Sequence, residues 1–289
     1  MPHSIRAKLN LGQKLRAAEI FAKFYLGFPL KKTPSKIQFD IHLAEHCNLN
    51  CKGCGHFSCI AEPEFLSVDE FKRDMNRAAE IFDHECDNIR LLGGEPLLNP
   101  EINTMLKIAR EIFTDGVIDI VTNGILLTQM SEDFWRTCHD YKIYIEISHY
   151  PIKLDENKIK ELADKFGVTC FWETDDLKDK FGVFPIDLSG KQDMRKNFIL
   201  CHVPTICITL KHGRLYPCYF AAHVHHFNKK FNKNVEITER DYIDIYKDIS
   251  KREIFKWLTK PVPVCRFCNI AGRHTTNWEI SKQDISEWL

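Results

Sequence analysis

Three cysteines that lie close together are the residues of this chain best suited to chemistry. Cys47, Cys51 and Cys54 have the spacing C-x3-C-x2-C and follow a short apolar run. Cysteine thiolates held this close together bind a soft metal ion or a metal cluster. A structural zinc site needs a fourth ligand, for which His46 and His56 are candidates. A four-iron cubane on three thiolates keeps one iron open for a small molecule, and the spacing favours this iron–sulfur interpretation.

A second group of cysteines lies in the last third of the chain and consists of Cys201, Cys218, Cys265 and Cys268. Four thiolates close a site completely, and both a zinc knuckle and a second cluster fit this number. Cys207 is a rival to Cys201 but stands close to Gly213 in the sequence. The remaining cysteines are scattered and are interpreted as small buried hydrophobic residues: Cys59, Cys86, Cys138 and Cys170.

The composition disfavours several other classes of protein. The chain has 289 residues, twelve cysteines and a formal net charge of zero. A neutral chain gives no simple electrostatic argument for a nucleic-acid partner. No apolar run reaches the roughly 18 residues of a membrane span, and we find no export signal. We therefore expect a cytoplasmic protein whose cysteines serve a metal or redox site rather than disulfides.

Short apolar runs alternate with amphipathic helices from residue 37 onward. Ser67 with Glu70, placed as a capping box, and Ser131 predict helix starts, and Gly167 predicts a helix end. The predicted strands are 37–44, 88–94, 117–124, 142–148 and 168–174, and the predicted helices are 67–82, 100–113, 131–140 and 154–167. This alternation predicts parallel strands with right-handed crossovers. We expect an α/β fold, a partial TIM-like barrel of five to six strands with its functional residues at the carboxyl ends.

The remaining parts of the chain flank this barrel. We divide the chain into an amphipathic helix within 1–36, the partial barrel at 37–190 and a small module at 191–289. Within the later part, residues 174–197 are expected to be loop, 205–220 a β-hairpin and 241–258 a helix. The histidines of segment 223–226 are placed on a basic loop and given no metal role.

Residues at the ends of three further predicted strands fit the same mouth as the cysteine loop. The segment 93–96 (GGEP) ends the second strand, Asn123 the third and Ser148 the fourth. With the three-cysteine loop, this combination resembles the radical S-adenosylmethionine (radical SAM) superfamily over residues 37–175. The resemblance implies that Cys47, Cys51 and Cys54 hold a [4Fe–4S] cluster whose open iron takes S-adenosylmethionine. It assigns the binding of this cosubstrate to Gly93, Gly94, Glu95, Pro96, Asn123 and Ser148.

One residue departs from the pattern of that superfamily. Gly53 stands where an aromatic residue usually precedes the third cysteine, and Phe57 is the candidate to replace it against the adenine. The resemblance implies that S-adenosylmethionine is cleaved reductively to a 5′-deoxyadenosyl radical, which abstracts hydrogen from a substrate. It also implies a flavodoxin or ferredoxin-type reductant as partner.

The second cysteine group resembles the auxiliary-cluster modules called SPASM and Twitch, especially the Twitch module of deoxy-scyllo-inosamine dehydrogenases. This resemblance implies a second [4Fe–4S] cluster without an open corner, which accepts an electron from the substrate so that a carbinol becomes a ketone. Radical SAM proteins of sugar and capsule gene clusters have segments similar to 147–151. They suggest a carbohydrate-like substrate: a sugar, an aminocyclitol or a nucleotide-sugar. His149 and Tyr150 are then candidate catalytic residues that deprotonate the substrate radical.

Three other functions remain open on the residues alone. A radical SAM epimerase needs a hydrogen-atom donor, for which Cys207 or Cys170 is suitable. A peptide-modifying radical SAM enzyme is a second alternative. The third is a zinc-stapled binding module without redox chemistry.

Overall fold

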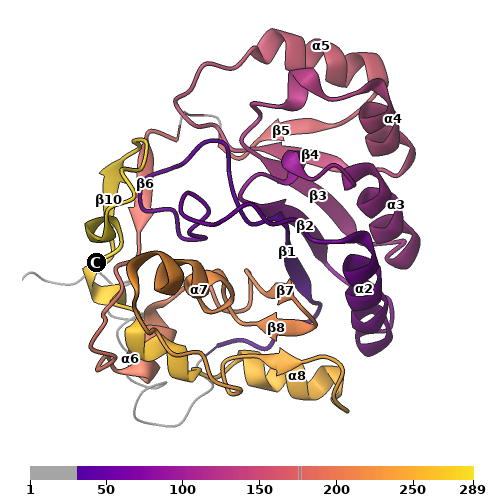
Figure 1. Ribbon diagram of the computed structural model, residues 1–289. Coiled ribbons are helices and arrows are strands. Elements are labelled where there is room, and N and C mark those ends of the chain that lie inside the picture. The colour runs from indigo at the N-terminus through magenta and orange to yellow at the C-terminus, as the bar shows by residue number, and fades with distance from the viewer. Residues whose placement is uncertain (1–30, 175, 177) are drawn as a thin grey trace, which may run out of the picture.

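A single curved sheet forms the centre of the computed structural model, which describes residues 31–174, 176 and 178–289 (Figure 1). Its strand order is β5-β4-β3-β2-β1-β7-β8-β9. The strands from β5 to β7 pair in parallel, whereas β7, β8 and β9 pair antiparallel. The sheet consists of β1 (Gln38–Ala44), β2 (Asn88–Gly93), β3 (Val117–Thr122), β4 (Tyr144–Ile147), β5 (Cys170–Trp172), β7 (Thr209–Lys211), β8 (Arg214–Tyr216) and β9 (Ile243–Asp244). Six parallel strands confirm the predicted partial barrel.

Four helices cover the outer face of the parallel strands: α2 (Val68–Phe82), α3 (Ile102–Ile112), α4 (Glu132–Asp140) and α5 (Glu156–Phe166). Phe39, Ile41 and Leu43 of β1 belong to the main hydrophobic core beneath these helices. Side chains alternate between the two faces of a strand. Asp40 therefore points the other way and lines a cavity on the inner face.

The expected caps of two helices are confirmed. Ser67 Oγ accepts a hydrogen bond from the Glu70 amide at 3.3 Å, and Ser131 Oγ accepts one from the Phe134 amide at 3.3 Å. Gly167 ends α5 with a φ of 69°, a left-handed conformation that glycine adopts without strain.

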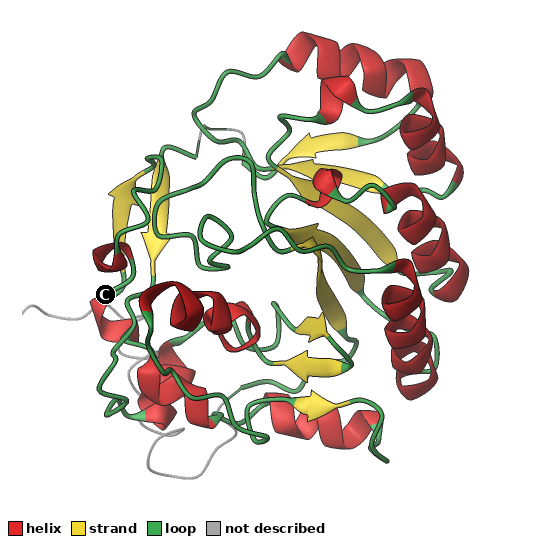
Figure 2. Ribbon diagram, in the orientation of Figure 1, coloured by secondary structure: helices red, strands yellow, loops and turns green. Residues whose placement is uncertain are grey.

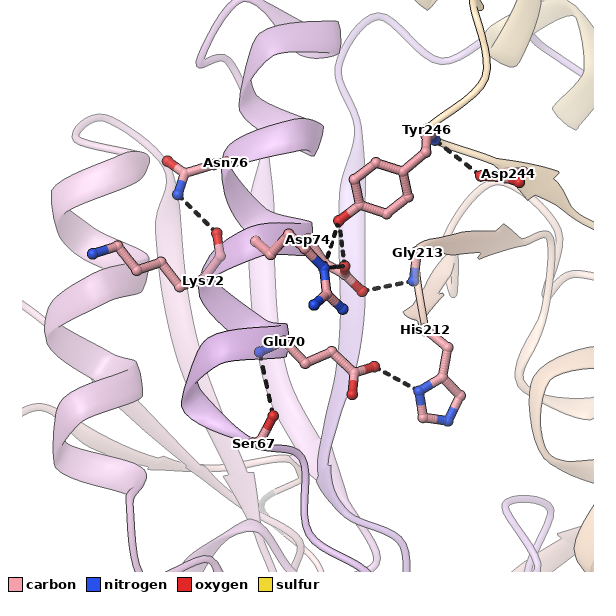
Figure 3. A network of polar contacts seen from close by, with 10 residues as sticks. Ser67, Glu70, Lys72, Asp74, Asn76, His212, Gly213, Asp244 and Tyr246 are labelled. Carbon is pink, nitrogen blue, oxygen red and sulfur yellow. Dashed lines mark hydrogen bonds and ion pairs between the residues drawn. The ribbon is translucent and has the colours of Figure 1, made fainter.

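The predicted hairpin at 205–220 is the β7–β8 pair, and it joins the barrel sheet because β7 pairs with β1. Asp74 of α2 fastens its turn (Figure 3). One carboxylate oxygen of Asp74 accepts a hydrogen bond from the Gly213 amide at 2.6 Å, and the other accepts one from the Tyr246 hydroxyl at 2.7 Å. The Glu70 carboxylate contacts His212 Nδ1 at 2.5 Å and so binds the hairpin rather than completing the predicted capping box with Ser67. Helix α2 is thus tied to a segment that lies about half the chain away.

The later part of the chain differs from the sequence-based expectation in three places. Residues 174–197 are not all loop, because they contain β6 (Lys180–Val183) and the start of α6 (Met194–Leu200). Residues 219–231 are not loop either but form α7 (Tyr219–Phe231), which includes the histidines of 223–226. The helix expected at 241–258 is only α8 (Lys251–Leu258), since Ser250 caps it with a complete capping box.

The last residues of the chain lie beside the loop that carries the first cysteines. Strand β10 (His274–Asn277) pairs antiparallel with β6. The long loop after β1, green in Figure 2, runs from the sheet to this pair, and an isolated bridge joins Cys51 to Ile280. The amphipathic helix expected in 1–36 falls mostly outside the described residues. Within the described part of the chain, no helix has the length and apolarity that crossing a membrane requires.

Candidate active site

The loop after β1 brings the first three cysteines to the wall of one cavity. Cys47, Cys51 and Cys54 line this cavity, whose volume is about 390 Å³, and we call it the first cavity. Asn50 and Gly53 have left-handed backbone conformations, with φ of 55° and 66°, and turn the loop around the three side chains. Burial raises the pKa of Cys47 and Cys51 to about 12. A metal that binds here therefore has to displace protons from these thiols.

The two glycines at the end of β2 hold the cysteine loop by close approach. A Cβ atom on Gly94 would lie 2.0 Å from the His46 carbonyl oxygen, and one on Gly93 would lie 2.2 Å from that of Ala44. The Gly94 amide donates a hydrogen bond to the Ala44 carbonyl oxygen at 2.8 Å, and the Glu95 amide donates one to that of His46 at 3.1 Å. Both glycines also line the first cavity. They are required because any side chain here would push the cysteine loop away.

Glu95 joins the ends of β2 and β3 from inside the protein. It is completely buried, and its carboxylate accepts hydrogen bonds from Thr122 Oγ1 at 2.7 Å and from the amides of Asn123 and Leu97 at 3.0 and 3.1 Å. Burial raises its pKa to about 7, although these hydrogen bonds lower it. Neither Glu95 nor Pro96 lines the first cavity. In this structure the carboxylate fixes the position of Asn123.

Asn123 and Ser148 do lie on the first cavity, as expected for residues at the ends of β3 and β4. Asn123 Nδ2 donates to Asn48 Oδ1 at 2.7 Å and lies 3.6 Å from the sulfur of Cys47. The structure thus brings the glycines, Asn123, Ser148 and the three thiols to one wall. This is the arrangement that the strand ends predicted.

Of the expected catalytic residues His149 and Tyr150 and the expected adenine neighbour Phe57, only Tyr150 lies on the first cavity. Tyr150 lines the first cavity. His149 does not; its ring packs on Trp172 with centroids 4.3 Å apart. Phe57 is buried in the second hydrophobic core, against Phe220, and lies away from the first cavity.

The C-terminal segment covers the cysteine loop, which the sequence did not predict. Trp278 Nε1 donates to the sulfur of Cys51 at 3.2 Å, and Trp288 Nε1 donates to the carbonyl oxygen of Cys54 at 2.9 Å. The Lys52 amide donates to the Glu279 carbonyl oxygen at 2.9 Å. Trp278 and Trp288 were the residues from which this contact could have been predicted, but their partners lie more than 200 residues away in the sequence.

The four cysteines of the second group also come together. Cys201, Cys218 and Cys268 line a second cavity beside the first. Burial raises the pKa of Cys268, and the neighbouring thiols of Cys265, Cys218 and Cys201 raise it further. Asn197 Nδ2 donates to the carbonyl oxygens of Cys265 and Cys268 and fixes the loop that carries them. Cys207, the rival to Cys201, instead lines the first cavity.

The distances between the sulfur atoms bear on whether a single metal ion or a cluster fits each group of cysteines. Sulfur atoms bound tetrahedrally to zinc at about 2.3 Å lie within about 4 Å of one another. Among the described residues, no three cysteines have sulfur atoms that all lie within 4.8 Å of one another. In neither group are three sulfur atoms gathered as closely as one zinc ion would hold them. A cubane separates its thiolate ligands further, and the three thiols of the first group are the kind of donors that a [4Fe–4S] cluster takes.

The histidines of α7 form a compact polar cluster with Glu45. Glu45 Oε2 lies 2.6 Å from His226 Nε2, 3.1 Å from His223 Nδ1 and 2.7 Å from Lys211 Nζ. Burial raises the pKa of Glu45, but His223 and His226 outweigh this and hold it below its usual range. The cluster thus joins the residue that follows β1 to α7 and to Lys211 of β7.

The comparisons with known proteins agree with this geometry. Residues 41–170 match the sequence model of the Radical SAM superfamily. These residues form a radical SAM domain. A relative called GTP 3′,8-cyclase from Desulforamulus reducens is 32% identical over 99 residues, which are 32% of this chain and 29% of that protein. Another of that name from Campylobacter jejuni is 28% identical over 128 residues, 43% of this chain and 38% of that protein. The chain thus spans about a third of these curated relatives.

A crystal structure extends the similarity beyond the radical SAM domain. BtrN, solved in complex with AdoMet and 2-DOIA, superposes with a TM-score of 0.51 and covers 82% of this chain and 94% of its own. Its sequence identity is 17%, so this likeness concerns the fold alone. The family that matches residues 41–170 implies one [4Fe–4S] cluster and S-adenosylmethionine as cofactors of this domain.

Proposed function

We propose that this protein is a radical SAM oxidoreductase of the dehydrogenase type that acts on a carbohydrate-like small molecule. The observation that carries the proposal is the common wall of the two cysteine groups. Gly55, Gly182, Phe184 and Tyr219 line both the first and the second cavity. A substrate in the first cavity would therefore lie next to a second redox centre. This arrangement suits a reaction that removes an electron from the substrate.

Cys47, Cys51 and Cys54 are proposed to hold the catalytic cluster, and Gly93, Gly94, Asn123 and Ser148 to contact S-adenosylmethionine. When bound, these groups supply the one-electron reductive cleavage that generates a hydrogen-abstracting radical. The residues of the chain position and shield this chemistry. Trp278 and the Leu49 amide direct N–H groups at the sulfurs of Cys51 and Cys47, at 3.2 and 3.4 Å. The C-terminal segment covers part of this loop, since Trp288 Nε1 donates to the carbonyl oxygen of Cys54.

Cys201, Cys218, Cys265 and Cys268 are proposed to hold a second [4Fe–4S] cluster with four protein ligands. A cluster without an open iron transfers electrons but binds no substrate. A carbinol that has lost its hydrogen atom becomes a ketone when its hydroxyl gives up a proton and the carbon gives up one electron. The second cluster would accept that electron. Tyr219 follows Cys218 directly, and its ring lies 4.9 Å from that of His56 on the first cavity, so it occupies the space between the two centres.

Metal analysis and S-adenosylmethionine cleavage test this proposal. Anaerobically reconstituted protein is expected to bind about eight irons, as two cubanes require. Cys51→Ala should abolish reductive cleavage of S-adenosylmethionine. Cys268→Ala should keep uncoupled cleavage but lower substrate turnover. Cys170→Ala, on β5 and away from both cavities, is the matched control and should change neither. Wild-type cleavage by Cys51→Ala would refute the assignment of the first cluster.

An epimerase is the second candidate, because Cys207 lies on the first cavity and Cys170 does not. A thiol there is able to return a hydrogen atom to a substrate radical, and no net oxidation would follow. Turnover in D₂O separates the two outcomes. An epimerase incorporates deuterium into its product and stops when Cys207 becomes alanine, whereas a dehydrogenase forms a ketone with either residue.

A further inference from the structure

The residue before the third cysteine has little room for a side chain. A Cβ atom on Gly53 would lie 3.1 Å from the Glu287 carbonyl oxygen and 3.3 Å from Val183 Cγ2. Gly53 also has a φ of 66°, a conformation that residues with side chains rarely adopt. Strand β6 and the C-terminal segment therefore fill the space that a larger residue at position 53 would need.

Strand β6 brings an aromatic ring to the same side of the cysteine loop. Phe181 and Val183 are two residues apart in this strand, so their side chains lie on one face of it. Because Val183 lies beside Gly53, Phe181 also faces the loop, and it lines the first cavity. The strand that excludes a side chain at position 53 thus supplies a ring of its own.

Tyr150 extends this aromatic surface. It lines the first cavity, and its ring centroid lies 6.4 Å from that of Phe181 and 6.1 Å from that of Trp278. Burial raises the pKa of Tyr150, and the neighbouring thiols of the first group raise it further. The two rings on the cavity therefore lie next to the three cysteines that we propose as cluster ligands.

The other benzene-type rings on the first cavity lie toward the second group of cysteines. Among the described residues that line this cavity, these are Phe184 and Tyr219, and both also line the second cavity. Tyr219 follows Cys218 directly, and the ring of Phe184 lies 5.7 Å from that of His202, the neighbour of Cys201. The first two rings do not line the second cavity. They are thus the aromatic surface that belongs to the first group alone.

We propose that Phe181, with Tyr150 beside it, stacks against the adenine ring of S-adenosylmethionine. A purine has two flat faces that stack on aromatic side chains, and removal of one such ring weakens binding ~10-fold or more. This inference rests on the proposed function, because it names the residues that recognise the nucleobase of the cosubstrate in the same cavity. It assigns Tyr150 to binding of the cosubstrate rather than to proton transfer.

Equilibrium binding to variants tests the proposal without turnover. Reconstituted protein, without reductant, is titrated with S-adenosylmethionine and with S-methylmethionine, a sulfonium compound that lacks the adenosine. Phe181→Ala should weaken binding of S-adenosylmethionine ~10-fold or more and leave the affinity for S-methylmethionine unchanged. Phe181→Trp, which keeps an aromatic face, should bind both as the wild type does. Phe171→Ala, at an exposed ring of β5 away from the first cavity, is the matched control and should also leave both affinities unchanged.

Photolabelling locates the adenine in the wild-type protein, and so decides the question even if Phe181→Ala does not fold. The protein is irradiated with 8-azido-S-adenosylmethionine, and the labelled peptide is identified by mass spectrometry. We expect the label on the peptides that contain Tyr150 or Phe181. A label elsewhere in the chain would overturn the proposal.

Two results of the binding experiment would overturn it as well. These are an unchanged affinity of Phe181→Ala for S-adenosylmethionine and an equal loss of affinity for both sulfonium compounds, which would indicate a disturbed cysteine loop. Iron content and S-adenosylmethionine cleavage are measured on the same preparations. If these are as expected for the wild type while the label lies elsewhere, the adenine site is wrong and the radical chemistry stands.

Discussion

Trp278 Nε1 lies 3.2 Å from the sulfur of Cys51, although 227 residues separate the two in the sequence. This contact directs an N–H dipole at a proposed ligand of the catalytic cluster. Hydrogen bonds to cysteine sulfurs are one of the means by which a protein sets the potential of an iron–sulfur cluster, since they stabilise the more negative, reduced state. The end of the chain therefore contributes to the electronics of a site that lies near its beginning.

Trp278→Phe should lower the reduction potential of the first cluster. The ring volume is largely kept, but the N–H donor is lost. A hydrogen bond worth about 1 kcal/mol corresponds to a shift of roughly 20–60 mV for one electron. Redox titration monitored by electron paramagnetic resonance, in a Cys268→Ala background, measures it. Trp257→Phe on α8 is the control with an unchanged potential. An equal potential in Trp278→Phe would mean that the tryptophan only packs.

Gly94→Ala should separate the cysteine loop from β2. The new Cβ would lie 2.0 Å from the His46 carbonyl oxygen, and this backbone contact has no flexible end that can move aside. We expect iron incorporation at the first site to fall several-fold and the protein to lose about 2 kcal/mol or more of stability. Gly182→Ala on β6 is the matched control, because nothing lies within 4 Å of its Cβ position. Similar losses in both variants would contradict the packing argument.

Asp74→Ala should loosen the β7–β8 hairpin from α2. The change removes the acceptor for the Gly213 amide and the Tyr246 hydroxyl in a buried contact (Figure 3). Two lost hydrogen bonds, one from a buried amide, should lower the free energy of unfolding by about 2–4 kcal/mol. Urea denaturation measures this loss. Asn76→Ala, which removes only a bond from an exposed side chain of α2 to the Lys72 carbonyl oxygen, should change stability by less than about 0.5 kcal/mol.

Asp40→Asn should stabilise the protein at high pH. The pKa of Asp40 is about 6 in the folded state, above the ordinary value of 3.8, because burial disfavours its charge. Since the folded state holds the proton more tightly, this residue destabilises the fold as the pH rises from about 4 through 6. The full effect is about 3 kcal/mol. The variant should therefore unfold at higher urea concentration than the wild type at pH 8, with a smaller difference at pH 5. A constant difference at both pH values would contradict the raised pKa.

The sequence predicted the barrel because its signals are local. The caps at Ser67 and Ser131 and the alternation of apolar runs depend on neighbours a few residues away. The strand ends that carry Gly93, Gly94, Asn123 and Ser148 were predictable for the same reason, since parallel strands place their carboxyl ends at one edge. The expected helix at 241–258 was partly wrong because Ser250 and Glu253 form a capping box, which marks a helix start inside the predicted range.

The tertiary structure alone decided which distant residues share the site. The order of the sheet places β7 beside β1, which brings Cys207 to Asp40 and sets Asp74 against the hairpin turn. Pairing of β10 with β6 brings Trp278 to Cys51. Such contacts depend on the packing of segments some 140 to 230 residues apart, and no local spacing encodes their partners. By itself the sequence determined the cysteine ligands that we propose and the strand ends around them. The fold decided that Arg90 lies beside Asp40 and Glu146 and that two tryptophans cover the cysteine loop, because both arise where distant segments of the chain meet.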